Sequence, residues 1–179
     1  MRAHDRHQGR RNEPHPYATR EDFNKVFHED MNGLYQLAFL LTGNHEKAER
    51  CFVAGIEDSV NENRVFREWA RSWAKRVVVE NAIRELKPHP NLPIASATVF
   101  SQNEQSSGSA GHFDLETILG LGDFERFVFV MSVLESYSDH ECALLLGCSV
   151  LEIRQARLHA LEELASSGQV VSFVPQLLT

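Results

Sequence analysis

The stretch SDHECALLLGCSVLEIRQARLHALEEL, residues 138–164, decides how the C-terminal half of the chain folds. It contains two Ser-x-x-Glu patterns eleven residues apart, Ser138 with Glu141 and Ser149 with Glu152. In such a pattern the serine hydroxyl accepts a hydrogen bond from the backbone N–H three residues on, and the glutamate carboxylate accepts one from the serine N–H. Each pattern therefore predicts the first turn of a helix.

Gly147 lies between the two patterns, where a helix needs a residue in the left-handed conformation to end. We therefore predict a helix over about 139–146, a tight turn, and a second helix over about 150–165. The apolar residues expected to pack these helices together and against a preceding helix are Ala143, Leu146, Val150, Ile153, Leu158, Leu161 and Leu164.

Two helices joined by a short turn that contains glycine are typical of a helix-turn-helix, whose second helix enters the major groove in DNA-binding proteins. A plain corner between two helices fits the same pattern, and the capping signals alone favour it. Residues 114–166 carry a net charge of −7, so DNA would be repelled beyond the immediate contact. The side chains available to a groove on the second helix are Arg154, Gln155, Arg157 and His159.

The composition is that of a soluble globular protein. The chain has 179 residues, of which 42% are hydrophobic and 24% charged, with a net charge of −7. No apolar run approaches the about 20 residues of a membrane span. The three cysteines form no Cys-x-x-Cys pair, so we expect reduced, buried thiols in a cytoplasmic protein without a zinc site. We also expect no cofactor and no metal.

The chain is expected to be all-α, with two small helical domains joined by a flexible linker. The linker is rich in proline at its start and in Ser, Gly, Gln and Asn afterwards. The sequence offers one strand candidate, VVSFV at 170–174. The expected segments are a disordered arm at 1–19, a helical domain at 20–88, the linker at 89–112, a helix-turn-helix domain at 113–166 and an apolar tail at 167–179.

Three helices are expected in the first domain. Apolar residues from Phe23 to Leu41 recur at three- and four-residue steps and predict a first helix that ends at Thr42-Gly43. A second helix is predicted over roughly 46–60, and a third from about Arg64 to Leu86.

The third helix carries a stripe of cations. Residues 64–87 have a net charge of +4, the most basic part of the chain expected to be structured. Cations placed on phosphates release counterions and give salt-dependent affinity, although most charged stripes are solvated helix faces. The stripe, at three- and four-residue steps, consists of Arg64, Arg67, Arg71 and Lys75, with Arg76 beside it. The apolar side chains expected to face the core from the opposite side are Phe66, Trp69, Ala70, Trp73 and Val77.

Three segments resemble the sigma-70 family of RNA polymerase sigma factors, of the extracytoplasmic-function type. DFNKVFHEDMNGLYQLAFLLTGNHEKAE, residues 22–49, resembles the start of region 2. FREWARSWAKRVVVENAIREL, residues 66–86, is similar to the helix of region 2 that contacts the promoter −10 element. ERFVFVMSVLESYSDHECALLLGCSVLEIRQARLHALEEL, residues 125–164, resembles region 4. The resemblance covers both expected domains in the family's order.

The resemblance implies a specificity subunit of transcription and not an enzyme. In the family, region 2 binds the polymerase clamp and captures an unpaired −10 base, while region 4 binds the polymerase flap and reads the −35 element. The implied partners are promoter DNA, the RNA polymerase core, and an anti-sigma factor or another regulatory protein. The DNA-binding residues implied here are Arg64, Arg67, Arg71, Lys75, Arg76, Ser149, Glu152, Arg154, Gln155, Arg157 and His159.

The segment that matches the clamp contact departs from the family pattern. The family usually continues after Ala-Glu with acidic and polar residues, whereas this chain has Arg50, Phe52-Val53 and Ala54, followed by Gly55. The alternative is therefore a sigma-like protein-interaction module that regulates transcription without binding the polymerase core. The residues expected to contact the polymerase or another partner are Glu49, Arg50, Phe52, Val53 and Ile56.

Opposite charges also favour contact between the two expected domains. Residues 64–87 are basic, residues 114–166 are acidic, and the linker is long enough for the two to meet. Under either hypothesis we expect the second domain to fold back on the stripe and inhibit DNA binding.

Overall fold

The computed structural model describes residues 16–61, 65–90 and 115–166. The regular secondary structure of these residues is helical, and an isolated β-bridge joins Tyr17 and Phe66. The all-α fold class is thereby confirmed. The predictions for residues 1–15, Arg64, most of the linker, the strand at 170–174 and the tail lie outside the described residues. The helices are α1 Arg20–Glu29, α2 Met31–Thr42, α3 His45–Asn61, α4 Ala70–Leu86, α5 Leu115–Gly120, α6 Asp123–Phe129, α7 Asp139–Leu146 and α8 Val150–Ser166.

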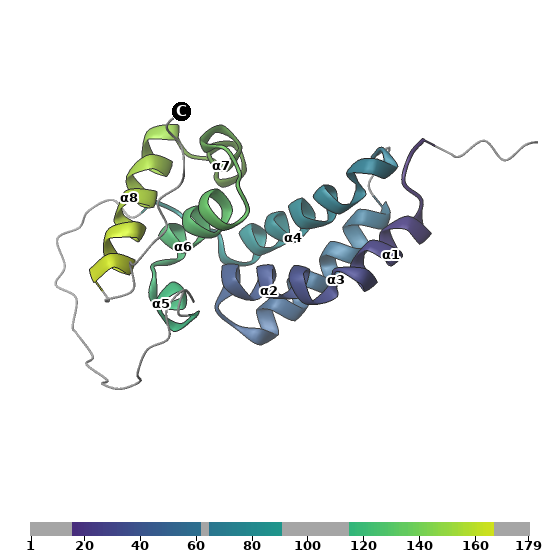
Figure 1. Ribbon diagram of the computed structural model, residues 1–179, viewed down its shortest axis with the longest axis horizontal. Coiled ribbons are helices and arrows are strands. Elements are labelled where there is room, and N and C mark those ends of the chain that lie inside the picture. Colours follow the sequence, from purple (N-terminus) through teal and green to yellow (C-terminus); the bar gives the residue numbers. More distant parts are fainter. Residues whose placement is uncertain (1–15, 62–64, 91–114, 167–179) are drawn as a thin grey trace, which may run out of the picture.

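Helices α1–α4 form one group, in which α3 packs against α2 and α4 (Figure 1). The single helix expected up to Thr42 is wrong, because the backbone bends at Asp30 and divides it into α1 and α2. Asp30 has φ −103° and ψ 16°, and its carboxylate accepts a hydrogen bond from Arg71 on α4. The predicted end at Gly43 is confirmed, since this residue has φ 63° and follows α2.

Gly55 lies where α3 crosses α4. A Cβ atom at this position would lie 3.2 Å from Val78 Cγ2, which is tighter than ordinary contact. The glycine weakens α3 by about 1 kcal/mol relative to alanine, but it permits the two helices to approach closely. The unusual glycine in the middle of α3 therefore has a packing reason.

The start of the third predicted helix differs from the expectation. Residues Arg67–Trp69 form a 3₁₀ turn, η1, and the α-helix α4 begins at Ala70. A 3₁₀ turn has about three residues per turn instead of 3.6. Side chains before Ala70 therefore do not lie on the face that the spacing of α4 would give them. The prediction that Phe66 and Trp69 face the core is wrong, because they are 40% and 58% exposed. Trp73 is half-buried.

Helices α6–α8 form a second group, in which α7 and α8 are the two predicted helices joined by a tight turn, while the short helix α5 packs against α2 (Figure 1). The predicted bounds are confirmed to within one residue. Both capping patterns are present: the N–H groups of Ser138 and Ser149 donate to Glu141 and Glu152 at 2.8 and 2.7 Å. Gly147 has φ 66° and ends α7. The expectation that Leu158 and Leu161 pack inside is wrong, since both are exposed.

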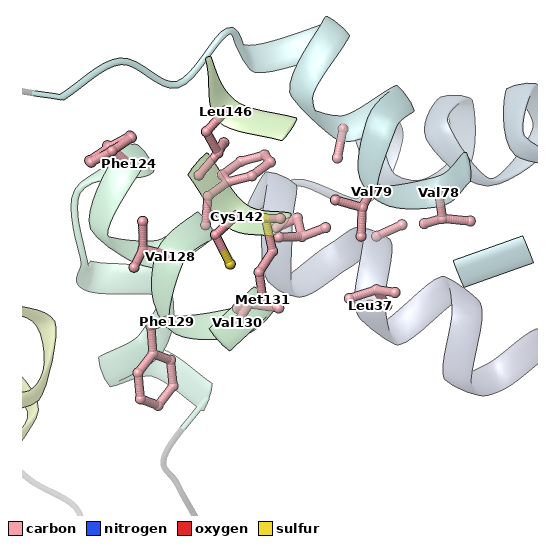
Figure 2. Packing of buried hydrophobic residues seen from close by; sticks show 14 of the residues in the cluster. Leu37, Val78, Val79, Phe124, Val128, Phe129, Val130, Met131, Cys142 and Leu146 are labelled. Carbon is pink, nitrogen blue, oxygen red and sulfur yellow. The ribbon is translucent and has the colours of Figure 1, made fainter. Parts of the chain in front are cut away.

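The buried side chains of the two groups form one continuous hydrophobic cluster. Figure 2 shows Leu37 and Val79, from α2 and α4, on one side of the contact, with Met131 and Cys142 on the other. Met131 belongs to a π-helical turn, η2 (Val130–Leu134), that continues α6. The described parts of the two groups therefore share a core, while their assignment to separate domains joined by a linker stays a prediction.

A buried guanidinium links the two groups. Arg126, 5% exposed, donates from Nε to the Leu41 carbonyl at 3.2 Å, from Nη1 to the Leu121 carbonyl at 3.0 Å and from Nη2 to Asp123 at 2.5 Å. The Leu41 carbonyl belongs to the last turn of α2, whose carbonyls lack partners within the helix. A cation also interacts favourably with this end of a helix. Arg126 thus caps α2 from the other group.

Two of the three thiols are buried, Cys51 on α3 in the first group and Cys142 on α7 in the second. Burial raises the pKa of Cys51 and of Cys142 to about 11, and it also raises that of the half-buried Cys148. All three cysteines are free. These thiols are poor nucleophiles at neutral pH and serve as small apolar side chains.

Replacement of Arg126 by Met should lower the free energy of unfolding by about 2–4 kcal/mol, because two buried carbonyls lose their donor. Denaturant titration of the purified variant measures this loss. Asp123→Asn is the matched control and should cost under about 1 kcal/mol, since the Asp123 side chain is half exposed. Equal stability of Arg126→Met and the parent chain would contradict the capping role of Arg126.

Candidate nucleic-acid interface

A groove of about 890 Å³ runs between the N-terminal half of α4 and the segment that joins η2 to α7. Its aromatic lining comes from both groups of helices, and so do its charges. The aromatic side chains are Phe66, Trp69, Trp73 and Tyr137, and the charged ones include Arg71, Lys75, Arg76, Glu135 and Glu141.

The aromatic rings at one end of the groove are accessible. Phe66 and Trp69 meet edge to face with centroids 5.4 Å apart, and Phe66 also stacks on Tyr17 at 5.1 Å. The indole Nε1–H of Trp73 is buried and has no hydrogen-bond partner among the described residues. Burial raises the pKa of Tyr137 to about 12, so its hydroxyl stays protonated at neutral pH. The groove thus combines ring faces with donor groups.

Arg71, Lys75 and Arg76 line this groove, whereas Arg67 does not. Each of these four cations meets a carboxylate of the same chain. Arg67 contacts Asp22 at 3.2 Å, and Lys75 contacts Glu135 at 2.6 Å. Arg71 contacts both Glu29 and Asp30, at 3.1 and 2.9 Å, and Arg76 pairs with Glu80 at 2.9 Å. Arg67, Arg71 and Lys75 remain exposed. Pairs at such exposure contribute about 0–1 kcal/mol each, so phosphates could replace the carboxylates.

The sequence pattern gives no indication of which carboxylates pair with the stripe. Spacing along one helix defines the stripe, but its partners come from α1, the bend at Asp30 and the residue after η2. The net charge of residues 64–87 suggests a free cationic surface, whereas the charge in space is largely balanced. The feature of the sequence that points to such internal partners is the excess of acidic residues elsewhere in the chain.

The Lys75–Glu135 pair is a contact between the predicted basic stripe and the second group of helices. Glu135 directly follows η2, and its N–H donates to the Val130 carbonyl at 3.0 Å. The next residue, Ser136, has φ 59°. The π turn and this strained residue aim Glu135 across the groove at α4.

The arginines of α8, the helix predicted to contact DNA bases, are also paired with a carboxylate of the same chain. Arg154 Nε donates to Asp139 at 2.9 Å and Arg157 Nη1 donates to it at 2.5 Å. The hydrogen bonds from Arg157 and then Arg154 lower the pKa of Asp139 below its ordinary value. Ser149 and Glu152 bond to each other as the cap of α8, while Gln155 and His159 are exposed. A role of these residues in DNA binding stays a prediction.

The residues of α3 predicted to contact a partner differ in exposure and in charge pairing. Arg50 contacts Glu46 at 2.7 Å and Glu85 at 2.6 Å, which neutralises the charge reversal noted in the sequence. Phe52 and Ile56 are half-buried against the core, and Phe52 lies edge to face with Phe27 at 5.6 Å. Glu49 and Val53 are exposed and line a shallow hollow of about 500 Å³. Only part of the expected apolar face is therefore available to a partner.

Comparison with protein-family models gives no match, and no curated protein shows significant similarity to the chain. None of the helices in the described residues is long and apolar enough to cross a membrane. Within the same residues, no group of three or more His, Cys, Asp or Glu side chains converges on a metal site.

Substitution of Asp139 by Asn should strengthen binding of a short DNA duplex by roughly three- to tenfold at low salt, because Arg154 and Arg157 become available to phosphates. Fluorescence anisotropy with a labelled duplex measures this change. Glu21→Gln removes the same charge from the exposed surface of α1, away from Asp139 and α8, and is the control. An equal gain in both variants would mean that net charge alone, and not release of the arginines, controls binding.

Proposed function

We propose that the protein is a sigma-factor-like regulator of transcription that binds promoter DNA together with the RNA polymerase core in the cytoplasm. The observation that carries this proposal is the exposed pair Phe66 and Trp69 in the lining of the groove, which also contains the cations Arg71 and Lys75. Arg67 lies between the two aromatic residues in the sequence. The sigma-70 resemblance of residues 22–49, 66–86 and 125–164 gives the same assignment.

This arrangement suits a single strand of nucleic acid. Bases stack on aromatic faces for about 1–3 kcal/mol each, while cations beside the rings follow the backbone. Trp69 is 58% exposed, so its indole is accessible for stacking with a base. In this proposal α4 binds the unpaired −10 strand and α8 binds the −35 duplex.

Binding requires the protein's own carboxylates to leave the cations. Asp22, Glu29 and Asp30 belong to the same group of helices as α4, so they can separate from Arg67 and Arg71 by side-chain rotation. Glu135 belongs to the other group, so full access to Lys75 also involves the contact between the two groups. We therefore expect weak intrinsic affinity for DNA that rises when the polymerase displaces Glu135 from Lys75.

The second candidate function is a protein-interaction module that regulates transcription without the polymerase core. It is favoured by the neutralised cations on α4 and α8 and by exposed leucines on the face of α8 expected to enter a groove. A pull-down with core polymerase separates the two candidates, since a stable complex supports the first and its failure supports the second.

The DNA-binding role of α4 is tested by the affinity of the full chain for a short labelled single strand at low salt. Trp69→Ala and Arg71→Gln should each weaken binding by about tenfold, and reversal of Arg67, Arg71 and Lys75 to Glu should abolish it. Trp69→Phe keeps a stacking surface and should restore most of the affinity.

Arg84→Gln is the matched control, because Arg84 lies at the other end of α4 and pairs with Asp58 at 2.5 Å. It removes one exposed cation from α4, as Arg71→Gln does, although it breaks one ion pair where Arg71→Gln breaks two, and it lies away from the groove residues. Binding should change by less than about twofold in this variant. If Arg84→Gln weakened binding as much as Arg71→Gln, or if the triple reversal had no effect, the role proposed for α4 would be wrong.

A further inference from the structure

The solvent face of α8 carries an apolar row that the helix-turn-helix fold does not use. Leu151 and Leu158 are 64% and 61% exposed, and they lie seven residues apart, which is close to two turns of helix. Leu161 is exposed on the same side of α8. The opposite face is buried, through Ile153, Ala156, Ala160 and Leu164. Long apolar side chains on a solvent face favour contact with another molecule.

The charges on this face are arranged symmetrically about Leu158. Arg154 lies four residues before Leu158 and Glu162 lies four residues after it. Two α8 helices packed antiparallel across Leu158 would therefore place each arginine opposite the partner's glutamate. The same register places Leu151 opposite Ala165 of the partner subunit, so that a large side chain meets a small one.

We propose that α8 is a self-association surface, on which α8 of a second copy of this chain packs antiparallel with Leu158 at the centre. The row of leucines supplies the apolar seam, and Arg154 and Glu162 form two symmetric ion pairs that fix register and orientation. The face suits a second copy because leucines occupy its centre and its charges, Arg154 and Glu162, are complementary to those of an antiparallel copy.

The rearrangement required on pairing is small. Arg154 is well exposed and shares Asp139 with Arg157, so it can turn toward the glutamate of a second copy while Arg157 keeps Asp139 paired. A single pair of helices of this length buries less than a standard interface of about 1,600 Å², so the dimer should be weak. Association would cover the α8 face assigned to DNA and would compete with duplex binding.

Sedimentation equilibrium of the full chain over a wide concentration range tests the proposal. The parent chain should show a monomer–dimer equilibrium, and Leu158→Gln should raise the dissociation constant by about tenfold or more. Leu144→Gln is the matched control, because Leu144 is 77% exposed but belongs to α7. Both leucines are on the surface, so neither variant should unfold, and circular dichroism checks this.

A charge exchange tests the register. Arg154→Glu and Glu162→Arg should each weaken the dimer, whereas the double variant should regain it, because the ion pairs are restored with their signs swapped. A chain that stays monomeric at all concentrations would overturn the proposal. A dimer that Leu158→Gln leaves intact, or that Leu144→Gln weakens equally, would also overturn it. A double variant that folds yet pairs no better than the single variants would overturn the antiparallel register.

Discussion

The Arg126 guanidinium is the interaction on which the described structure depends most. It is a buried cation whose donors satisfy carbonyls at the end of α2 and before α6, so it fixes one group of helices on the other. Gly43 lies beside this guanidinium, and glycine is favoured there by its φ of 63° and not by lack of space, since a Cβ would lie 3.7 Å from Arg126 Cζ in ordinary contact. The hydrophobic cluster then continues across both groups, from Leu37 and Val79 to Met131 and Cys142 (Figure 2).

This packing gives the cationic row on α4 its counterions. A helix that carried these cations alone would attract phosphates strongly and without selectivity. Here Glu135 is brought to Lys75 by the π turn, and the N-terminal helix supplies the carboxylates for Arg67 and Arg71. Asp139 does the same for the cations of α8. The cations on both surfaces proposed to bind DNA are thus already paired with the protein's own carboxylates. A ligand must therefore make contacts in addition to charge pairing in order to displace these carboxylates.

Local sequence signals predicted much of the fold. The features that they did not predict depend on contacts between residues far apart in the chain. The helix-turn-helix followed from two capping boxes and Gly147, because such signals act within four residues. The exposure of Trp69 was not predictable in this way, since it lies in the 3₁₀ turn before Ala70 and does not follow the helical spacing of α4. The internal partners of the stripe were also missed. Asp22 and Glu135 are 45 and 60 residues away from Arg67 and Lys75 along the chain, and spacing carries no information at that range.

Denaturant unfolding followed by two probes tests most directly whether the two groups form one unit. Both tryptophans, Trp69 and Trp73, belong to the first group, while circular dichroism reports the helices of both groups. A shared core linked by Arg126 predicts that the fluorescence and dichroism transitions coincide at a single midpoint. Two separate midpoints would show that the groups unfold independently. That result would contradict the conclusion that the two groups share a core and that the second group covers part of α4.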